Sequence, residues 1–191
     1  MLRLRYQTPS TWQDAVRDDF DAFLRDHAHA ERKVASSAMA LSAQHHRRPE
    51  LVAAMIELAM EELTHFQQVH ELLRARGQTI GQAGPNPYMT KLFKQLRRVD
   101  VNEYLLDRLL LFSIVEARGC ERFQLVSEVI PAGPARDFYA DLVRAEAQHH
   151  FLFLQFARKY FDVARVEKRL DELLDAEAEI VAGLVIRAAL H

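Results

Sequence analysis

Glu62-Leu-Thr-His65 and Glu146-Ala-Gln-His149 are the two stretches of sequence on which the predicted fold depends. Each places a carboxylate and an imidazole three residues apart, and on a helix these are neighbouring positions of one face. A single pair carries little information, because chance alone predicts about 0.7 such pairs in a chain with this many glutamates and histidines. The spacing gains its meaning from the residues around it.

Two further glutamates turn these pairs into an internal repeat. Glu31 precedes Glu62 by 31 residues, and Glu116 precedes Glu146 by 30. The chain thus reads Glu followed by Glu-x-x-His twice, which supplies four carboxylates and two imidazoles: Glu31, Glu62, His65, Glu116, Glu146 and His149. This ligand set is typical of the two-metal sites of ferritin-like four-helix bundles.

Length and composition predict one globular all-α domain over residues 1–191. Hydrophobic residues make up 49% of the chain and charged residues 27%, and the six prolines separate long uninterrupted segments. A net charge of −2 gives no general attraction to nucleic acid or to an anionic membrane. The single cysteine excludes an internal disulfide, and no stretch resembles a signal peptide or a membrane span. We therefore expect a cytoplasmic protein.

In four segments, apolar residues recur at alternating steps of three and four residues, the spacing of a helix face that packs in a core. In each segment the Glu and His residues of the repeat occupy positions of this buried face, where an apolar residue is expected. The stripes run from Phe20 to Leu41, Leu51 to Leu72, Leu105 to Ile130 and Ala135 to Tyr160. Residues 77–87 are predicted to be a loop, and residues 88–98 a short basic helix. Together they form the long crossover between the second and third helices that a ferritin-like bundle needs.

A last helix is predicted from about Val163 to Ala189, packed outside the four-helix core. Its apolar stripe carries no acid and consists of Leu170, Leu174, Ala178, Val181 and Val185. A different choice of stripe would bury Glu177, but the fully apolar stripe is preferred.

Four carboxylates at core positions need a source of positive charge, since burying them unpaired costs several kcal/mol each. Two divalent cations would neutralise them, and mixed oxygen and nitrogen ligands suit iron or manganese. The alternative is an ordinary bundle in which these acids pair with Arg or Lys at its rim. His27 lies one turn before Glu31 and is either a partner of the ligands or a core histidine. Cys120, one turn after Glu116, either lines the cavity or packs as a small thiol.

The remaining histidines are expected at the surface. They are His29, His45, His46, His70, His150 and His191.

Three stretches resemble the tRNA hydroxylases called MiaE, which act on 2-methylthio-isopentenyladenosine beside the anticodon. They are Asp26-His-Ala-His-Ala-Glu31-Arg-Lys33, Glu61-Glu-Leu-Thr-His-Phe66, and Asp107-Arg-Leu-Leu with Glu116-Ala-Arg-Gly-Cys-Glu-Arg-Phe123. The similarity extends over about Pro9 to Tyr160, and the last stretch is the most specific to this family.

The resemblance implies a ferritin-like fold, a non-haem centre of two Fe, and O2-dependent hydroxylation of the isopentenyl group. The ligands implied are the six residues of the repeat, and Leu109, Phe112 and Phe123 are expected as walls of the cavity. The electrons would come from an external donor, a separate reductase, because nothing in the chain resembles a flavin or iron-sulfur domain. We expect the protein to bind tRNA and not to bind a membrane. We also expect it to be a monomer or a small homo-oligomer. Lys91, Lys94, Arg97 and Arg98 could meet tRNA phosphates, or form the solvated face of a helix.

Three alternatives stay open. Another di-iron hydroxylase, of the demethoxyubiquinone type, would need an exposed apolar surface for membrane docking. An iron-storage or peroxide-scavenging protein would form a large shell or carry a cysteine-rich iron domain. A structural bundle with a vestigial site would contain no metal.

Overall fold

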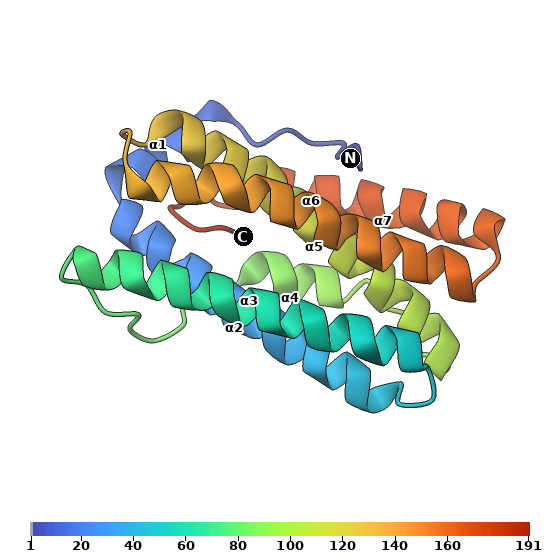
Figure 1. The fold of residues 1–191 in the computed structure, drawn as a ribbon. Helices are drawn as coiled ribbons and strands as arrows, with labels where there is room; N and C mark the ends of the chain where they lie inside the picture. Colours follow the sequence, from blue (N-terminus) through green and yellow to red (C-terminus); the bar gives the residue numbers. More distant parts are fainter. Residues whose placement is uncertain (1) are drawn as a thin grey trace. The chain divides into compact units, whose positions relative to one another are not determined.

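The computed structural model describes residues 2–191, and these residues contain seven helices and no strands (Figure 1). The helices are α1 (Ser10–Asp18), α2 (Phe20–Gln44), α3 (Pro49–Ala75), α4 (Pro87–Phe93), α5 (Val101–Val129), α6 (Pro134–Tyr160) and α7 (Val163–Ala182). None of the helices within residues 2–191 combines the length and apolar character needed to cross a membrane.

Local sequence signals account for the helix boundaries. Asp19 leaves helical geometry with a φ of −138° and accepts a hydrogen bond from the backbone N–H of Ala22, so it separates α1 from α2. Asn86, Asp100 and Asp162 cap α4, α5 and α7 in the same way. Gly77 follows the end of α3 and has a φ of +70°. This left-handed conformation ends a helix, and glycine adopts it without strain.

The chain divides into two compact units. Unit 1 contains residues 2–14, 86–186 and 191, and unit 2 contains residues 15–85 and 187–190. The boundary falls within α1, and each unit contains one copy of the Glu, Glu-x-x-His repeat. The single domain expected over residues 1–191 stays a prediction.

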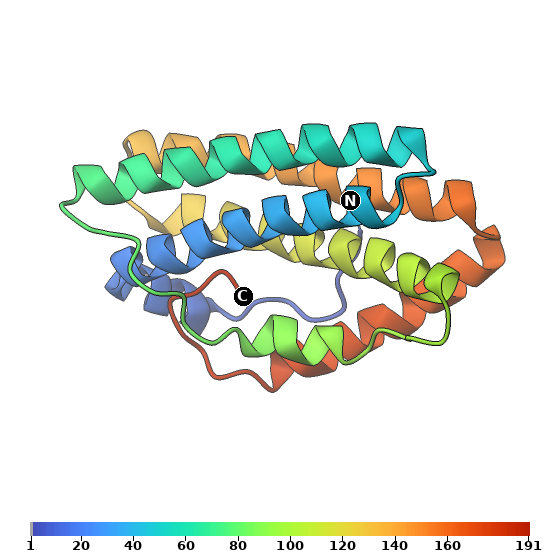
Figure 2. The same ribbon diagram turned by 90° about the horizontal axis from the view of Figure 1, so that it is seen from below.

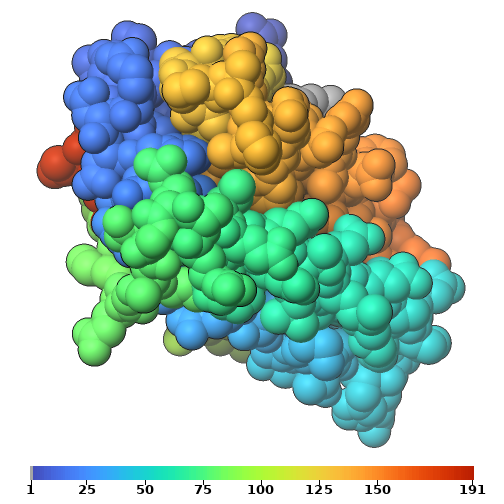
Figure 3. All heavy atoms as spheres, turned by 60° about the vertical axis from the view of Figure 1, so that its left-hand side comes forward, coloured from blue at the N-terminus to red at the C-terminus, as the bar shows by residue number. Residues whose placement is uncertain are grey.

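Unit 2 is built on the helix pair α2 and α3, which lie side by side and run in opposite directions (Figure 2). The buried residues of α2 include most of the predicted stripe, and its neighbours Ala28 and Ala35 are buried as well, so the buried face is wider than predicted and rich in small side chains. Small side chains allow two helices to approach closely, and the space-filling view shows the surface of α3 continuing into that of α2 (Figure 3).

Unit 1 is organised around α5, which packs against α6 and α7. Every residue of α5 from Leu105 to Cys120 is buried, as expected of a helix that is covered all round. α4 packs against α7. The connection between α3 and α5 is long and includes α4, as predicted, but α4 ends at Phe93 and the predicted helix over 88–98 is therefore too long.

Two expectations for the last helix are wrong. It ends at Ala182, before Gly183, and Val185 is 87% exposed. Glu177 is fully buried, so α7 also buries the stripe that contains this acid. The reason lies on α5, where the Nε of Arg118 donates to Glu177 over 2.8 Å, and on α4, where the Tyr88 hydroxyl donates to the same carboxylate over 3.2 Å.

Candidate metal centre

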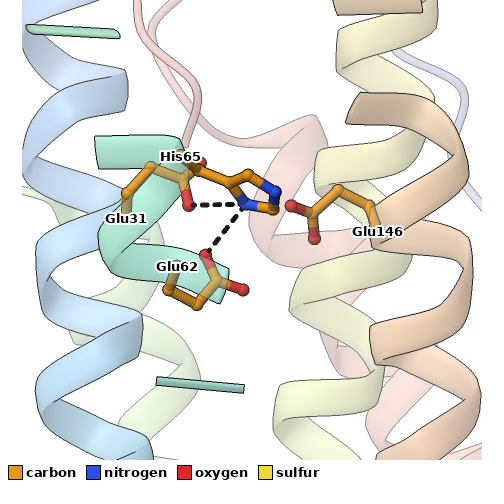
Figure 4. A group of neighbouring side chains, drawn as sticks. All are labelled: Glu31, Glu62, His65 and Glu146. Atoms are coloured by element: carbon orange, nitrogen blue, oxygen red, sulfur yellow. Dashed lines mark ion pairs between the residues drawn. The ribbon is translucent and has the colours of Figure 1, made fainter. Parts of the chain in front are cut away.

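In unit 2 a triad of two carboxylates and one imidazole forms where α2 packs on α3. Glu31 comes from α2, Glu62 and His65 come from α3, and one donor atom from each lies within 4.8 Å of the others. The Nδ1 of His65 is 3.8 Å from an oxygen of Glu31 and 3.6 Å from an oxygen of Glu62. Figure 4 shows the polar ends of these three side chains turned toward one another. The two carboxylates are 3% and 1% exposed, so water does little to screen them.

His27 is the nearest neighbour of this triad on α2. Its Nε2 forms a short hydrogen bond with Glu31, one turn further along the helix. Burial, and next the charge of His65, lower the pKa of His27 to about 3. The charge of Glu62 opposes this shift without reversing it. The ring is therefore neutral near pH 7, and it holds one oxygen of Glu31 in a fixed direction. His27 is thus a fully buried histidine bonded to Glu31, and its role as a partner of a metal ligand stays a prediction.

Unit 1 contains the second triad, formed where α5 packs on α6. Glu116 comes from α5, Glu146 and His149 come from α6, and one donor atom from each lies within 4.8 Å of the others. The Nδ1 of His149 is 3.4 Å from an oxygen of Glu146. All three residues are at most 5% exposed. The two units thus contain the same three donor groups in the same order along the chain.

The donor chemistry of both triads fits iron or manganese. Each triad offers two carboxylates and one imidazole, and neither contains sulfur. Two carboxylates buried this deeply in each unit need cations nearby, since isolated buried charges are costly. A divalent metal in each unit would supply the missing charge.

The residues predicted to line the cavity in unit 1 all lie buried on α5. Phe112 packs against Phe153 of α6, with ring centroids 5.4 Å apart, and Phe123 packs against Tyr139 at 5.6 Å. Leu109 is fully buried as well. These contacts give the α5 and α6 pair an apolar interior that keeps water away from charged groups.

Cys120 is a packing residue with an inert thiol. Its Sγ donates to the carbonyl oxygen of Val143 over 3.3 Å. Burial, and next the charge of Glu146, raise the pKa of this thiol to about 11. The thiolate that a metal would need is therefore disfavoured at neutral pH.

The four basic residues predicted to contact tRNA do not behave alike. Lys91, Lys94 and Arg98 are exposed. Arg97 is engaged in the fold instead, because its guanidinium donates to the buried carboxylate of Asp107 over 2.6 Å and also pairs with Glu103. Its own backbone N–H donates to Asp107 over 2.7 Å. Arg97 thus fastens the end of the connection to α5.

Four of the histidines expected at the surface are buried, and this expectation is wrong for them. They are His29, His45, His150 and His191. His191, for example, stacks on Tyr88 with ring centroids 5.0 Å apart. No periodicity argument finds such contacts, because the partners come from distant parts of the sequence.

Comparison with known proteins decides the family. The model of the tRNA-(MS[2]IO[6]A)-hydroxylase (MiaE) family matches residues 2–191. The chain belongs to the MiaE family. A relative from Pseudomonas putida, named tRNA 2-(methylsulfanyl)-N(6)-isopentenyladenosine(37) hydroxylase, is 33% identical over 174 residues, which are 91% of this chain and 84% of that protein. A relative of the same name from Salmonella typhimurium is 29% identical over 132 residues, or 69% and 48% of the two chains.

A solved structure confirms the fold class that the sequence predicted for this MiaE family member. It is named Protein 43 with aldehyde deformylating oxygenase activity from Synechococcus, and it matches with a TM-score of 0.94 and 31% identity. The match covers 100% of this chain and 96% of the other. The chain therefore has the ferritin-like all-α fold, with a long crossover and an additional C-terminal helix.

Proposed function

We propose that this MiaE family member is an O2-dependent monooxygenase that hydroxylates the isopentenyl group of 2-methylthio-isopentenyladenosine in tRNA. The observation that carries the proposal is the repeated triad, one in each unit, in a chain whose whole described length matches this family. The names of the Pseudomonas and Salmonella relatives support the choice of substrate. A tRNA substrate also fits the cytoplasmic location expected from the sequence.

The six residues of the two triads are proposed as the ligands of two Fe ions. Iron would supply the redox chemistry that O2 activation needs. The carboxylates and imidazoles of the chain bind and orient the metals, and the hydrogen bond from His27 directs one oxygen of Glu31. The apolar side chains along α5 exclude water from the reacting centre.

The overall reaction needs a partner that delivers electrons. One oxygen atom of O2 enters the C–H bond and the other leaves as water, which consumes two electrons and two protons from outside. No thiol of the chain can serve as the reductant, since Cys120 is the only cysteine and is buried. We infer that a separate reductase serves this centre.

For tRNA binding, Lys91, Lys94 and Arg98 are the exposed cations that we propose to meet phosphates. Arg97 contributes to this surface by fixing the segment that carries its neighbours, since its side chain is bound to Asp107. Replacing the three exposed residues with Ala should weaken tRNA binding and leave iron loading intact, measured by fluorescence anisotropy and elemental analysis. Unchanged binding would remove these residues from the interface.

A second candidate activity is suggested by the solved structure, whose name records aldehyde deformylating oxygenase activity. The two candidates differ in substrate, so a direct assay separates them. Purified protein loaded with iron would be supplied with a reductant, O2 and either isopentenylated tRNA or an aldehyde. An added oxygen atom on the modified adenosine, detected by nucleoside mass spectrometry, supports the proposed function; turnover of the aldehyde alone overturns it.

A further inference from the structure

The outer face of α3 exposes large apolar side chains that the function described so far does not use. Ile56, Met60 and Leu63 are 42%, 65% and 51% exposed. They recur at steps of four and three residues, so they share one face of the helix, and we call them the α3 stripe. Figure 3 shows α3, coloured from cyan to green, at the surface of the molecule. Apolar side chains exposed side by side are typical of surfaces that bind another molecule.

The α3 stripe lies behind the proposed metal ligands of unit 2. Glu62 and His65 of the same helix are turned toward Glu31 (Figure 4). Met60 is two positions before Glu62, and two positions correspond to a rotation of about 200° around a helix. The stripe and the ligands therefore use different faces of α3, roughly one helix diameter, ~10 Å, apart. A molecule bound to the stripe would be separated from the triad by this one helix.

The surroundings of the stripe are acidic. Glu57 and Glu61, one turn apart, are exposed beside it. α3 contains no Lys or Arg before Arg74, and its neighbour α2 contains no charged residue over residues 34–44. An acidic rim repels tRNA phosphates and anionic lipid headgroups, and it attracts a protein surface rich in Lys and Arg.

The size of the stripe favours a transient partner over a second copy of the chain. From Ile56 to Leu63 it extends over about 10 Å of helix. A stable complex buries roughly 800 Å² and 20–30 residues on each side, whereas electron-transfer partners bind through smaller interfaces. A twofold interface joins one patch to itself, so two copies packed stripe to stripe would also bring the acidic rims of both chains together.

We propose that the α3 stripe is the docking surface of the redox protein that delivers electrons to the centre. The partner is a flavin or iron-sulfur protein whose docking face is apolar in the middle and rimmed by Lys and Arg. This inference rests on the proposed function, which takes up two electrons in each reaction. The partner is oxidised by two electrons, and these electrons with two protons convert one atom of O2 to water while the other atom enters the C–H bond. Docking on α3 would bring the donor within one helix of Glu62 and His65.

The test compares two sources of electrons for the hydroxylation of isopentenylated tRNA by iron-loaded protein. Dithionite with methyl viologen is small and needs no docking surface. NADPH with a soluble protein extract of the native host cells, freed of small molecules and of this protein, supplies electrons through the partner. Fractionation of the extract by this activity yields the donor protein. Its binding to the metal-free protein is then measured by biolayer interferometry at several salt concentrations.

The variants place charges in the stripe or change its rim. Met60→Glu and Leu63→Glu should each weaken donor binding, and raise the donor concentration for half-maximal turnover, about tenfold or more, because a charge enters the apolar centre of the interface. Glu57→Lys should weaken binding about threefold at low salt and less at high salt, because it reverses one rim charge. Val163→Glu is the matched control, since it adds the same charge at a residue of unit 1 that is 54% exposed. Iron content and turnover with dithionite should be unchanged in all four variants.

The outcomes separate the docking surface from the function. If the wild type hydroxylates tRNA with dithionite but Met60→Glu and Leu63→Glu use the donor as the control does, the docking proposal is overturned and the proposed function stands. The same conclusion follows if no fraction of the extract supports turnover, if these variants dissociate a wild-type dimer, or if the stripe binds phosphatidylglycerol vesicles. Hydroxylation with neither source of electrons overturns both proposals. Losses confined to the stripe variants and to the protein donor support the docking surface.

Discussion

The two triads contain the same donor groups but differ in what surrounds them. Glu31 and Glu116 occupy equivalent positions of the repeat, and four residues before each lie His27 and Phe112. His27 forms a hydrogen bond with Glu31, whereas Phe112 packs on Phe153. Unit 2 therefore fixes its first carboxylate with a polar partner, and unit 1 surrounds its triad with apolar side chains. The repeat thus preserves the donor groups of the two triads while the residues one turn before them differ.

The largest expected effect comes from breaking each triad in turn. His65→Ala and His149→Ala each remove the single imidazole of one triad, and each should lower hydroxylation by more than about 100-fold, since even partners of ligands are worth 10- to 100-fold. Iron per chain, measured by elemental analysis, should fall in both variants. His70→Ala on α3 is the control. Full activity in either imidazole variant would show that its triad holds no metal.

The second largest effect is a loss of stability, and it concerns a buried ion pair of unit 1. Glu177→Ala leaves the buried guanidinium of Arg118 without its main carboxylate, which should lower the free energy of unfolding by about 3–5 kcal/mol. Adding Arg118→Met should recover much of that loss, because the buried charge is gone. Urea denaturation measures both variants. Equal stability of the single and double variants would contradict the assigned cause.

The third effect comes from exchanging His27 and Phe112, the residues that differ between the two triads. His27→Phe makes unit 2 resemble unit 1 and should weaken iron affinity about 10- to 100-fold, because Glu31 loses its hydrogen bond. Phe112→His places an imidazole in an apolar setting and should cost ~1–3 kcal/mol of stability. Competition with a chelator measures the affinities. Equal loss of iron affinity in the two variants would show that the surroundings of the triads are not functionally different.

The smallest effect concerns the residues four positions after the first glutamates, which are Ala35 and Cys120. The folded pKa of Cys120 is about 11 and its ordinary value is 9.0, so the unfolded chain loses this proton first as pH rises. The contribution is fully present below pH 9 and is lost between about pH 9 and 11, at up to ~1.4 kcal/mol per unit. Cys120→Ala, which copies unit 2, should cost about 1 kcal/mol and remove this dependence. Thermal melts across that pH range, with the wild type as the reference, provide the measurement.

Local spacing predicted much of the fold. Most of the stripe from Phe20 to Leu41 is buried as predicted, although Phe20 itself is only half-buried. Both Glu-x-x-His pairs lie on helices and each converges with its preceding glutamate. These features follow from helical periodicity, which depends on residues only three or four positions apart.

Contacts between distant segments explain what the sequence could not predict. The period of α7 alone predicts that Glu177 is a surface acid. It is buried because Arg118, 59 residues earlier, donates to it. Arg97 reads as a free cation, but Asp107 and Glu103 bind it. In both cases a charged residue is buried or bound because of a partner of opposite charge, and the period of one helix carries no information about such partners.

The hydrogen bonds from Arg118 to Tyr6 and Thr8 affect the order in which this part of the protein can fold during synthesis. Its guanidinium donates to the carbonyl of Tyr6 and to the hydroxyl of Thr8, and Glu121 accepts from Thr8 as well. Thr8 leaves the ribosome 113 residues ahead of Glu121. At ordinary rates of elongation, this segment waits roughly 6–20 s before its partners exist. Tyr6 and Thr8 are therefore made well before the residues that bind them.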